Sequence, residues 1–498
     1  MDQFVVKSKL PSHEIPNISV GEYFLQNITR NINENPQRIA FINSENGTKT
    51  TYSEFQKEAL HVASSLLSDD LLLSSDDLVM FFGDNSLQYV ILIVAMAYLG
   101  LPATPAKSAN GCFEVAQQLV DSKASVLCIS ASQRHLATIQ QVSEQHPTAL
   151  EHLKVIILID GGDETVADTL KESLKMKSIT TYQKLLEHSK DALPLATIPH
   201  FSVDPQSGTY AIIYTSGSSG LPKGAIHSHR SFLAAILAMQ ASKVFIDSHQ
   251  AVVSFIYPGV KVPEMVSSRL RNRYNAEVHE LYGQTEFMGG VSSMLSVYEP
   301  GNVGEPLPNV EMKIVHLSTG FSLPSGEEGE ICLRGPNCFL GYLNNAKATA
   351  EAIDTQTGFF RTGDVGYADS RGCLFITDRI KELIKYKHWS VSPAEIEVFL
   401  QTHPSVVEAC VVGVKHATEG AHLRAYVLLK NKGENGSMVT EKEIAQYVQD
   451  NMGYQKRLNG GVHFVASIPR TIIGKIDRQH FKNLVKGEVL IEKAEAEK

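Results

Sequence analysis

The chain has 498 residues, a formal net charge of −9, 43% hydrophobic residues and 20% charged residues. Typical domains have ~50–250 residues, so this length predicts at least two domains. The acidic balance excludes a basic nucleic-acid-binding protein, because neutralising phosphates requires an excess of Lys and Arg. The hydrophobic fraction is large enough for a core and excludes a disordered or collagen-like chain.

The cysteines and the two ends of the chain indicate which cellular compartment to expect. The six cysteines form no CxxC pair and have no nearby His cluster, which disfavours a zinc site and a disulfide framework. The first residues lack the pattern of a signal peptide, and the last three are not a peroxisomal tripeptide. We therefore expect a cytoplasmic protein, with peripheral association with a membrane and the oligomeric state left open.

In chain order, short β-branched runs alternate with helical patterns. The predicted strands are Leu78–Phe82, Ser125–Ile129, Val155–Ile159 and Tyr210–Tyr214. The most apolar run, Tyr89–Leu101, is shorter than the ~20 residues that span a bilayer, so it predicts a buried helix and no transmembrane segment. This alternation is typical of βαβ units and a mostly parallel sheet. We predict an α/β fold with a large N-terminal domain of layered βαβ subdomains over residues 1–377.

The pattern of predicted helices and strands changes towards the C-terminus. Ser392, followed by Pro and then Glu, is a good start for a helix, and Thr440 begins a second capping box. Two strand-like runs, Val406–Val414 and Leu423–Leu429, lie between them. These elements predict a small α+β domain over residues 378–498.

A Ser/Gly-rich loop, YTSGSSGLPKG at residues 214–224, follows the last predicted strand directly. Glycines let backbone N–H groups approach a polyphosphate, hydroxyls add donors, and Lys223 adds a positive charge. A Walker loop requires Gly before the Lys and Ser or Thr after it, whereas Pro222 and Gly224 flank this Lys. A P-loop NTPase is therefore disfavoured, and a flexible loop is the alternative to a phosphate site.

Three later segments carry further polar candidates. The run YGQTE at residues 282–286 places a hydroxyl beside a carboxylate, which suits Mg²⁺. Asp364 stands between glycines and is suited to accept hydrogen bonds from a ribose, and Lys475 follows a Gly near the C-terminus. Taken singly, each segment favours a turn over a site.

Together and in this order, the segments resemble the adenylate-forming (AMP-binding) enzymes, which include acyl-CoA synthetases, 4-coumarate–CoA ligases and firefly-type luciferases. The resemblance runs from about Glu22 to Lys482 and includes Gly329–Pro336 and Thr377–Glu397. It implies an acid–CoA ligase that converts a fatty or aromatic acid and ATP·Mg²⁺ into acyl-adenylate and pyrophosphate. CoA then takes the acyl group and AMP is released. ATP, Mg²⁺, CoA and a small carboxylic acid are thus the implied ligands.

The resemblance also implies roles for single residues. Thr285 would contact the α-phosphate, Glu286 would hold Mg²⁺, and the backbone of Tyr282 and Gly283 would border the adenine. Lys475 would bridge the carboxylate and the α-phosphate as charge builds there. The residues that would cradle the phosphates are Thr215, Ser216, Gly217, Ser218, Ser219, Gly220 and Lys223.

Asp364 would hold both ribose hydroxyls, with Arg379 assisting. In the family the small domain rotates about a hinge between the two half-reactions; Lys381 matches that hinge, and Lys385 lies on the face presented for thioester formation. The alternative for residues 378–387 is a solvated helix start. The family commonly has Gly where His388 and Trp389 follow the second Lys, and this bulk would narrow the CoA tunnel.

The spacing departs from the family. Tyr214 and Tyr282 are only 68 positions apart, so elements of the acyl-binding pocket around residues 242–260 are expected to be missing. A splice variant, a misannotated gene model or a degenerate paralogue would look like this. Two hypotheses follow: a working ligase with a rebuilt pocket, or a non-catalytic or impaired product that at most binds nucleotide or a partner. A luciferase-like oxygenase shares every motif and is a weaker third.

Overall fold

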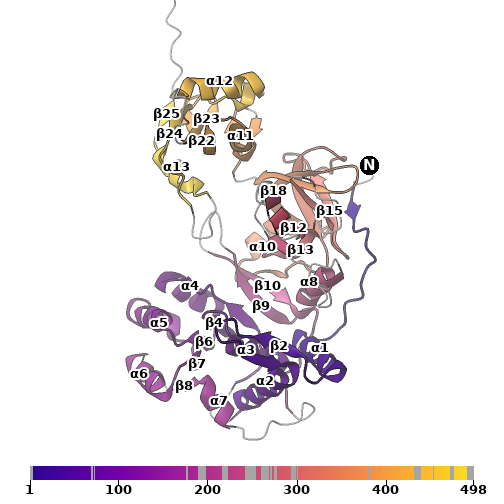
Figure 1. Ribbon diagram of the computed structural model, residues 1–498, viewed down its shortest axis with the longest axis vertical. Coiled ribbons are helices and arrows are strands. Elements are labelled where there is room, and N and C mark those ends of the chain that lie inside the picture. The colour runs from indigo at the N-terminus through magenta and orange to yellow at the C-terminus, as the bar shows by residue number, and fades with distance from the viewer. Residues whose placement is uncertain are drawn as a thin grey trace, which may run out of the picture.

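The computed structural model describes residues 4–68, 71, 73–174, 176, 178–188, 198–215, 222–241, 254–258, 268–269, 272–273, 277–292, 299, 301–379, 382–387, 389–430, 439–452, 454–470 and 476–490. Figure 1 shows an N-terminal α/β part, a β-rich middle part and a C-terminal part that follow one another along the longest axis. The first two parts carry the predicted nucleotide motifs, and each is built on its own sheet.

The α/β part contains an eight-stranded sheet. In spatial order its strands are β17 (Gly341–Tyr342), β10 (Gly224–Ser228), β9 (Thr209–Tyr214), β5 (Ala103–Pro105), β4 (Val79–Phe82), β6 (Val126–Ser130), β7 (Val155–Ile159) and β8 (Ile179–Thr181). In the spatial order from β9 to β8, each strand is parallel to its neighbours. At the other edge β10 is antiparallel to β9, and β17 is antiparallel to β10. The predicted α/β class and the mostly parallel sheet are confirmed.

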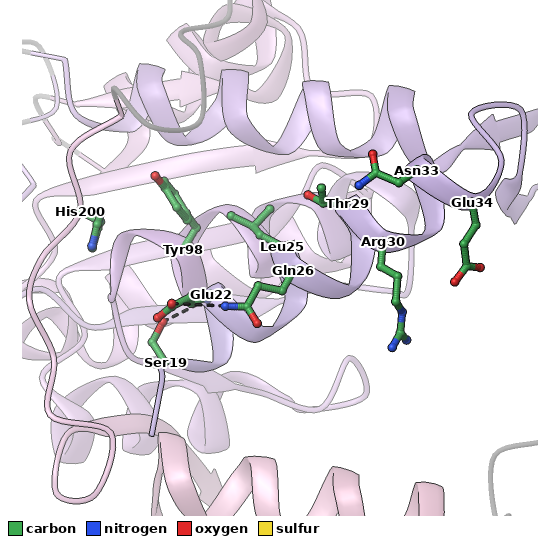
Figure 2. Close-up of a pocket in the computed structure, with 10 residues that line it drawn as sticks. All are labelled: Ser19, Glu22, Leu25, Gln26, Thr29, Arg30, Asn33, Glu34, Tyr98 and His200. Atoms are coloured by element: carbon green, nitrogen blue, oxygen red, sulfur yellow. Dashed lines mark hydrogen bonds between the residues drawn. The ribbon is translucent and has the colours of Figure 1, made fainter. Parts of the chain in front are cut away.

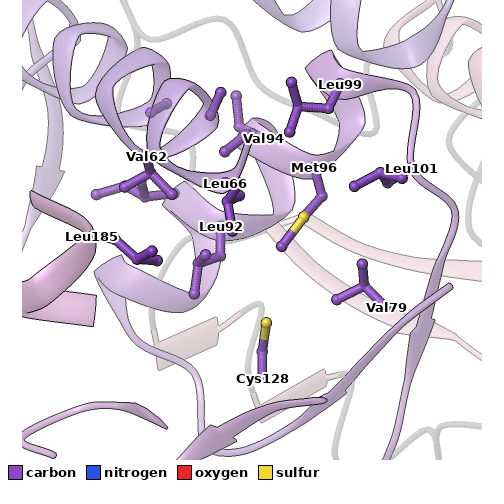
Figure 3. Close-up of a cluster of buried hydrophobic side chains, with 14 of the residues drawn as sticks. Val62, Leu66, Val79, Leu92, Val94, Met96, Leu99, Leu101, Cys128 and Leu185 are labelled. Carbon is purple, nitrogen blue, oxygen red and sulfur yellow. The ribbon is translucent and has the colours of Figure 1, made fainter. Parts of the chain in front are cut away.

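Helices cover both faces of this sheet because its central strands are apolar on both sides. On one face lie α1 (Val20–Glu34), α2 (Tyr52–Leu66), α3 (Leu87–Leu99) and α7 (Tyr182–His188). On the other face lie α4 (Cys112–Ser122), α5 (Gln133–Gln145) and α6 (Glu164–Leu174). Along β4, Val79 and Phe81 enter the first core while Met80 and Phe82 enter the second. Figure 3 shows the first core, with α2 and α3 packed over the sheet.

The predicted buried helix is α3. Ser86 caps its start, its hydroxyl accepting the N–H of Tyr89, and Gly100 ends it in the left-handed conformation at φ 79°. Its side chains Leu92 and Leu99 are fully buried in the first core. No helix among the described residues has the length and apolarity needed to cross a membrane.

The middle part is a nine-stranded, mainly antiparallel sheet. Its strands in order are β1 (Val6–Lys7), β15 (Glu311–Val315), β16 (Gly329–Arg334), β18 (Phe360–Ala368), β19 (Leu374–Arg379), β14 (Asn302–Pro306), β13 (Phe287–Ser292), β12 (Glu277–Gln284) and β11 (Ser254–Pro258). Helices α8 (His229–Ala241) and α10 (Ala346–Ala352) lie beside it, α8 against β13 and α10 against β18. A separate pair, β2 (Ile39–Ile42) and β3 (Lys49–Thr51), leads into α2.

The C-terminal part is an α+β unit around a third sheet. Its strands are β21 (Trp389–Val391), β20 (Ile384–Tyr386), β23 (Gly420–Leu429), β22 (Val406–His416), β25 (Val489–Leu490) and β24 (Gly461–Phe464). Its helices are α11 (Pro393–Leu400), α12 (Glu441–Asn451) and α13 (Arg478–Leu484). The capping box expected at Thr440 is present, with Glu443 as its partner. The solvated helix start considered for residues 378–387 is not found among the described residues of that segment, where Asp378 and Arg379 end β19 and Ile384–Tyr386 form β20. The domain boundary at 377/378 stays a prediction.

Helix α8 is tied to the N-terminal helix through a buried histidine. His229 is 1% exposed, and its Nδ1 accepts the N–H of Val20 at 3.0 Å, one of the amides that a helix start leaves without an intrahelical partner. Its ring lies 5.3 Å from that of Tyr210, and its Nε2 has no hydrogen-bond partner among the described residues. Burial lowers the pKa of His229 to about 4, so the ring is neutral at ordinary pH.

This histidine predicts acid lability. An unfolded His titrates near ~6.5, so the contribution of neutral His229 is complete above that pH and is lost as the pH falls towards its folded pKa of about 4. We expect the free energy of unfolding to fall by at most ~1.4 kcal/mol per pH unit from this group over that window. The variant His229→Gln retains a hydrogen-bond acceptor but does not titrate, and should show a shallower pH dependence in chemical unfolding between pH 7 and pH 4. Identical slopes would contradict the assignment.

Candidate active site

The predicted phosphate loop leaves the eight-stranded sheet between β9 and β10. These strands form an antiparallel pair in which Tyr214 lies opposite Gly224, and the N–H of Thr215 donates to the carbonyl of Lys223 at 2.9 Å. The Tyr214 hydroxyl donates to Asp121 at 2.7 Å, and burial raises the pKa of that phenol. A Cβ at Gly224 would lie 2.8 Å from Ile212, so a side chain has no room there. Both ends of the loop are therefore held firmly.

A carboxylate of the nine-stranded sheet lies next to this loop base. Glu286 sits in the Thr285–Glu286 turn between β12 and β13, and its Oε1 accepts the hydroxyl of Tyr342 at 2.6 Å. The ammonium of Lys223 lies 5.0 Å from the Tyr342 ring centre. Burial, reinforced by the bond to Glu286, raises the pKa of Tyr342, so its hydroxyl remains a donor at ordinary pH. Glu286, Tyr342 and Lys223 thus form one cluster.

A second carboxylate, that of Asp364, is held by side chains of β12, the strand that precedes the Thr285–Glu286 turn. Asp364, on β18, is 4% exposed, and its Oδ2 accepts from the Tyr282 hydroxyl at 2.8 Å and from Gln284 Nε2 at 2.5 Å. Gln284 Nε2 also donates to the carbonyl of Thr362 at 2.9 Å. A Cβ at Gly283 would lie 3.0 Å from the backbone of Phe287 and Gly289, so this position is tightly enclosed. The residues expected beside adenine and ribose are therefore in direct contact.

A buried histidine holds the turn itself. His227 of β10 is fully buried, and its Nε2 lies 2.7 Å from the Thr285 carbonyl oxygen, so Nε2 carries the proton and donates. Its Nδ1 lies 3.3 Å from the Ser231 hydroxyl. Burial lowers the pKa of His227, which favours this neutral form. The turn that carries Thr285 and Glu286 is thus held by β10 as well as by its own strands.

The structure brings together six of the predicted site residues, namely Lys223, Tyr282, Gly283, Thr285, Glu286 and Asp364. Thr215 lies at the loop base, and Arg379 is described only through its backbone, which pairs with Asp364 between β19 and β18. Lys385 is exposed on β20, in the C-terminal sheet. The remaining candidates lie outside the described residues: Ser216, Gly217, Ser218, Ser219, Gly220, Lys381 and Lys475.

Sequence reasoning assigned no role to His227, Gln284 or Tyr342. Gln284 stands inside the YGQTE motif, and Tyr342 lies shortly after Gly329–Pro336; their polar groups suit them as partners for the carboxylates nearby. His227 follows Ala225 and Ile226 in a short strand, where a polar residue after apolar ones signals a buried hydrogen bond.

A cavity of about 780 Å³ lies elsewhere, along α1. Figure 2 shows its walls, in which Tyr98 and His200 face Glu22 and Gln26 of the helix. None of the predicted site residues lines it. It therefore gives no support to the site described above.

The predicted phosphate loop joins β9 and β10 of the eight-stranded sheet, and the nine-stranded sheet places two hydrogen-bonded carboxylates, Glu286 and Asp364, in the same region. This arrangement, followed by a small α+β unit, is that expected of a nucleotide-using enzyme with a large and a small domain. Comparison with known proteins identifies the class. The AMP-binding enzyme family matches residues 28–258 and 247–343, and the AMP-binding enzyme C-terminal domain matches residues 395–475. The chain belongs to the AMP-binding, adenylate-forming enzymes. The expected enzyme type, an acid–thiol ligase, is confirmed at the level of the family.

Its relatives are named as CoA ligases. The 4-coumarate–CoA ligase CCL1 of Humulus lupulus is 28% identical, with 96% of each chain covered. The probable 4-coumarate–CoA ligase 1 of Dictyostelium discoideum is 30% identical over 71% of this chain and 77% of its own. Among solved structures, ATP-bound MatB of Rhodopseudomonas palustris has a TM-score of 0.73 at 21% identity, covering 92% of this chain and 98% of its own. This solved structure has the same fold as the present chain.

The comparisons also bear on the length of the chain. The alignment with the Humulus lupulus protein spans 563 positions, which exceeds the 498 residues of this chain, so at least 65 positions lack a counterpart here. The AMP-binding family matches in two pieces that meet within residues 247–258. The two pieces meet inside the interval from Tyr214 to Tyr282, where the motif spacing predicts that elements are missing; which elements are missing stays a prediction.

The contact between His227 and Thr285 can be tested directly. His227→Leu removes the donor and leaves the Thr285 carbonyl without its partner, which costs ~1–3 kcal/mol for a buried group. We expect a lower midpoint of chemical unfolding and faster hydrogen exchange in the peptide containing residues 285–286. His227→Gln, which retains an N–H donor, should restore most of both. Equal exchange in all three proteins would contradict this role of His227.

Proposed function

We propose that the protein is an ATP-dependent acid–CoA ligase. It joins a carboxylic acid to the α-phosphate of ATP with release of pyrophosphate, and CoA thiol then displaces AMP to give an acyl-CoA thioester. The observation that carries the proposal is the contact between YGQTE and Asp364, through Tyr282 and Gln284, with Glu286 and Lys223 beside it. The acids named for the relatives suggest an aromatic or fatty acid as substrate.

The donors at the site suit a nucleotide and Mg²⁺. Glu286 offers the hard carboxylate oxygen that Mg²⁺ prefers, and Tyr342 fixes one of its two oxygens, while the other has no hydrogen bond from the described residues. When bound, Mg²⁺ supplies charge neutralisation at the phosphates. In the proposal Lys223 and the loop 215–223 bind the β- and γ-phosphates, Thr285 contacts the α-phosphate, and Asp364 binds the ribose with Arg379.

The charge that develops at the α-phosphate requires a cation, and the proposal assigns Lys475 to this role. A unit charge at ~4 Å contributes ~4 kcal/mol at an effective dielectric of ~20. By analogy with an oxyanion donor, its loss should cost ~10²–10³ in rate.

A second candidate function rests on the missing segment. At least 65 positions of the relative have no counterpart in this chain, and the proposal assigns them to the interval where the acyl pocket is expected. A chain with an intact nucleotide side and an incomplete acyl side would bind ATP without activating an acid. Such a product, whether a splice variant or an impaired paralogue, is the alternative to a working ligase. The proposed setting in both cases is the cytoplasm, and the free thiol state of all six cysteines fits a reducing compartment.

Exchange of labelled pyrophosphate into ATP separates the two candidates. A working ligase should catalyse exchange that depends on one member of a panel of cinnamic, benzoic and fatty acids. ATP binding in calorimetry without exchange on any acid would favour the nucleotide-binding product. Light emission with luciferin in air would instead indicate the oxygenase.

Two lysine variants should separate the half-reactions. Lys475→Ala should lower acid-dependent exchange by ~10²–10³ while preserving thioester formation from supplied acyl-adenylate. Lys385→Ala is the matched control and should preserve exchange while slowing thioester formation, because Lys385 is assigned to the CoA step. Equal losses in both half-reactions for either variant would contradict these assignments.

A further inference from the structure

Strand β18 contains a bulge at the residue assigned to the ribose. In the ladder between β16 and β18, Arg361 lies opposite Cys332, and Val365 lies opposite Glu330. The three residues of β18 between these pairs, 362–364, therefore lie opposite a single residue of β16. A bulge bends a strand and re-aims its side chains, and bulges are frequent next to active sites. The β18 bulge, residues 362–364, thus sets the direction of the carboxylate with which it ends.

The backbone of the β18 bulge requires a glycine. Gly363 has a φ of 69°, in the left-handed region that residues with a Cβ adopt only at a cost in free energy. A Cβ at this position would meet no other atom within 4 Å, so the conformation and not the space favours glycine. The N–H of Gly363 donates to a side chain of the neighbouring strand, Glu330 Oε1, at 3.3 Å.

Glu330 uses both of its carboxylate oxygens to hold the bulge. The residue is 3% exposed on β16, and its Oε1 accepts the N–H of Gly363. Its Oε2 accepts from Arg361 Nε at 2.9 Å and from Arg361 Nη2 at 2.6 Å. Arg361 thereby supplies the positive charge that a buried carboxylate requires. Glu330 therefore ties the backbone of the bulge to the side chain that precedes it.

Thr362 fixes the bulge from within. Its hydroxyl donates to the carbonyl of Ile331 at 2.8 Å and accepts the N–H of Asp364 at 3.1 Å. The backbone of Asp364 is therefore held by a side chain two residues earlier, and its carboxylate reaches Tyr282 and Gln284 from this fixed position.

We propose that Glu330 and Thr362 are positioning residues for nucleotide binding. They act through Asp364, by fixing the β18 bulge that aims its carboxylate, and not by contact with the nucleotide. This rests on the proposed function, in which Asp364 binds the ribose. When the bulge relaxes, the carboxylate leaves the position in which it accepts from the ribose hydroxyls. The loss should therefore fall on recognition of these hydroxyls, while the contacts to the phosphates remain.

The test compares the binding of ATP and 2′,3′-dideoxy-ATP to the full chain by calorimetry. The wild type should bind ATP at least ~10-fold more tightly, because hydrogen bonds to a charged acceptor are lost with the dideoxy compound. Thr362→Val lacks the hydroxyl, and Glu330→Gln has a single oxygen that cannot serve Gly363 and Arg361 together. Each variant should lower the ratio of the two affinities by at least ~3-fold.

Two further variants are the matched controls. Thr362→Ser keeps the hydroxyl and should preserve the wild-type ratio. Glu311→Gln weakens another Glu–Arg pair, in which Arg334 Nε donates to Glu311 at 2.8 Å between β16 and β15, and it should preserve the ratio as well. The unfolding midpoint of each variant shows whether it folds, and two independent bulge variants keep the test valid if one of them does not.

The two possible failures are distinguishable. If the wild type discriminates but both bulge variants bind the two nucleotides more weakly by the same factor, or bind them unchanged, the positioning roles are overturned and the ribose assignment of Asp364 stands. If the wild type does not discriminate, the ribose assignment is overturned, and the positioning roles fall with it.

Discussion

The site depends on two hydrogen bonds that cross from one sheet to the other. His227 of β10 donates to the Thr285 carbonyl at 2.7 Å, and Tyr342 of β17 donates to the Glu286 carboxylate at 2.6 Å. Both donors belong to the eight-stranded sheet, and both acceptors lie in a two-residue turn of the nine-stranded sheet. A hydrogen bond to a charged group contributes ~1.5–3 kcal/mol. These contacts therefore position the turn close to Lys223, which lies at the C-terminal end of the predicted phosphate loop.

The shortened interval leaves this arrangement in place for a topological reason. The two pieces of the family match meet within residues 247–258, and the strands that hold the turn, β10, β13 and β17, all lie outside those residues. In the described part of the chain, β11 is the last strand of the nine-stranded sheet, paired in parallel with β12. An edge strand is a place where a sheet tolerates change but also recruits other chains. The contacts that hold the turn therefore do not depend on the segment around residues 247–258.

Local patterns predicted the elements, and distant contacts determined the site. The apolar run around Leu92 between Ser86 and Gly100, and the capping box at Thr440, each define a helix within one short window. His227 and Thr285 are 58 residues apart, and Tyr342 and Glu286 are 56 apart, so no window contains both partners. The family resemblance predicted that Glu286 and Asp364 belong to one site, but it assigned no role to the neutral side chains that hydrogen-bond to them. Lys475 and the Ser/Gly loop stay predictions.

The ion pairs of Glu382 limit where the proposed domain rotation can occur. Its carboxylate binds Arg478 Nε at 3.1 Å and Lys482 at 3.2 Å, both on α13. Glu382 therefore moves with the C-terminal unit, whereas Arg379 is fixed in β19 of the nine-stranded sheet. The predicted hinge residue Lys381 stands between these two residues in the sequence, outside the described part of the chain, and its role in a rotation stays a prediction. Helix α11 lies against β19 in this arrangement, and that contact would have to break on rotation.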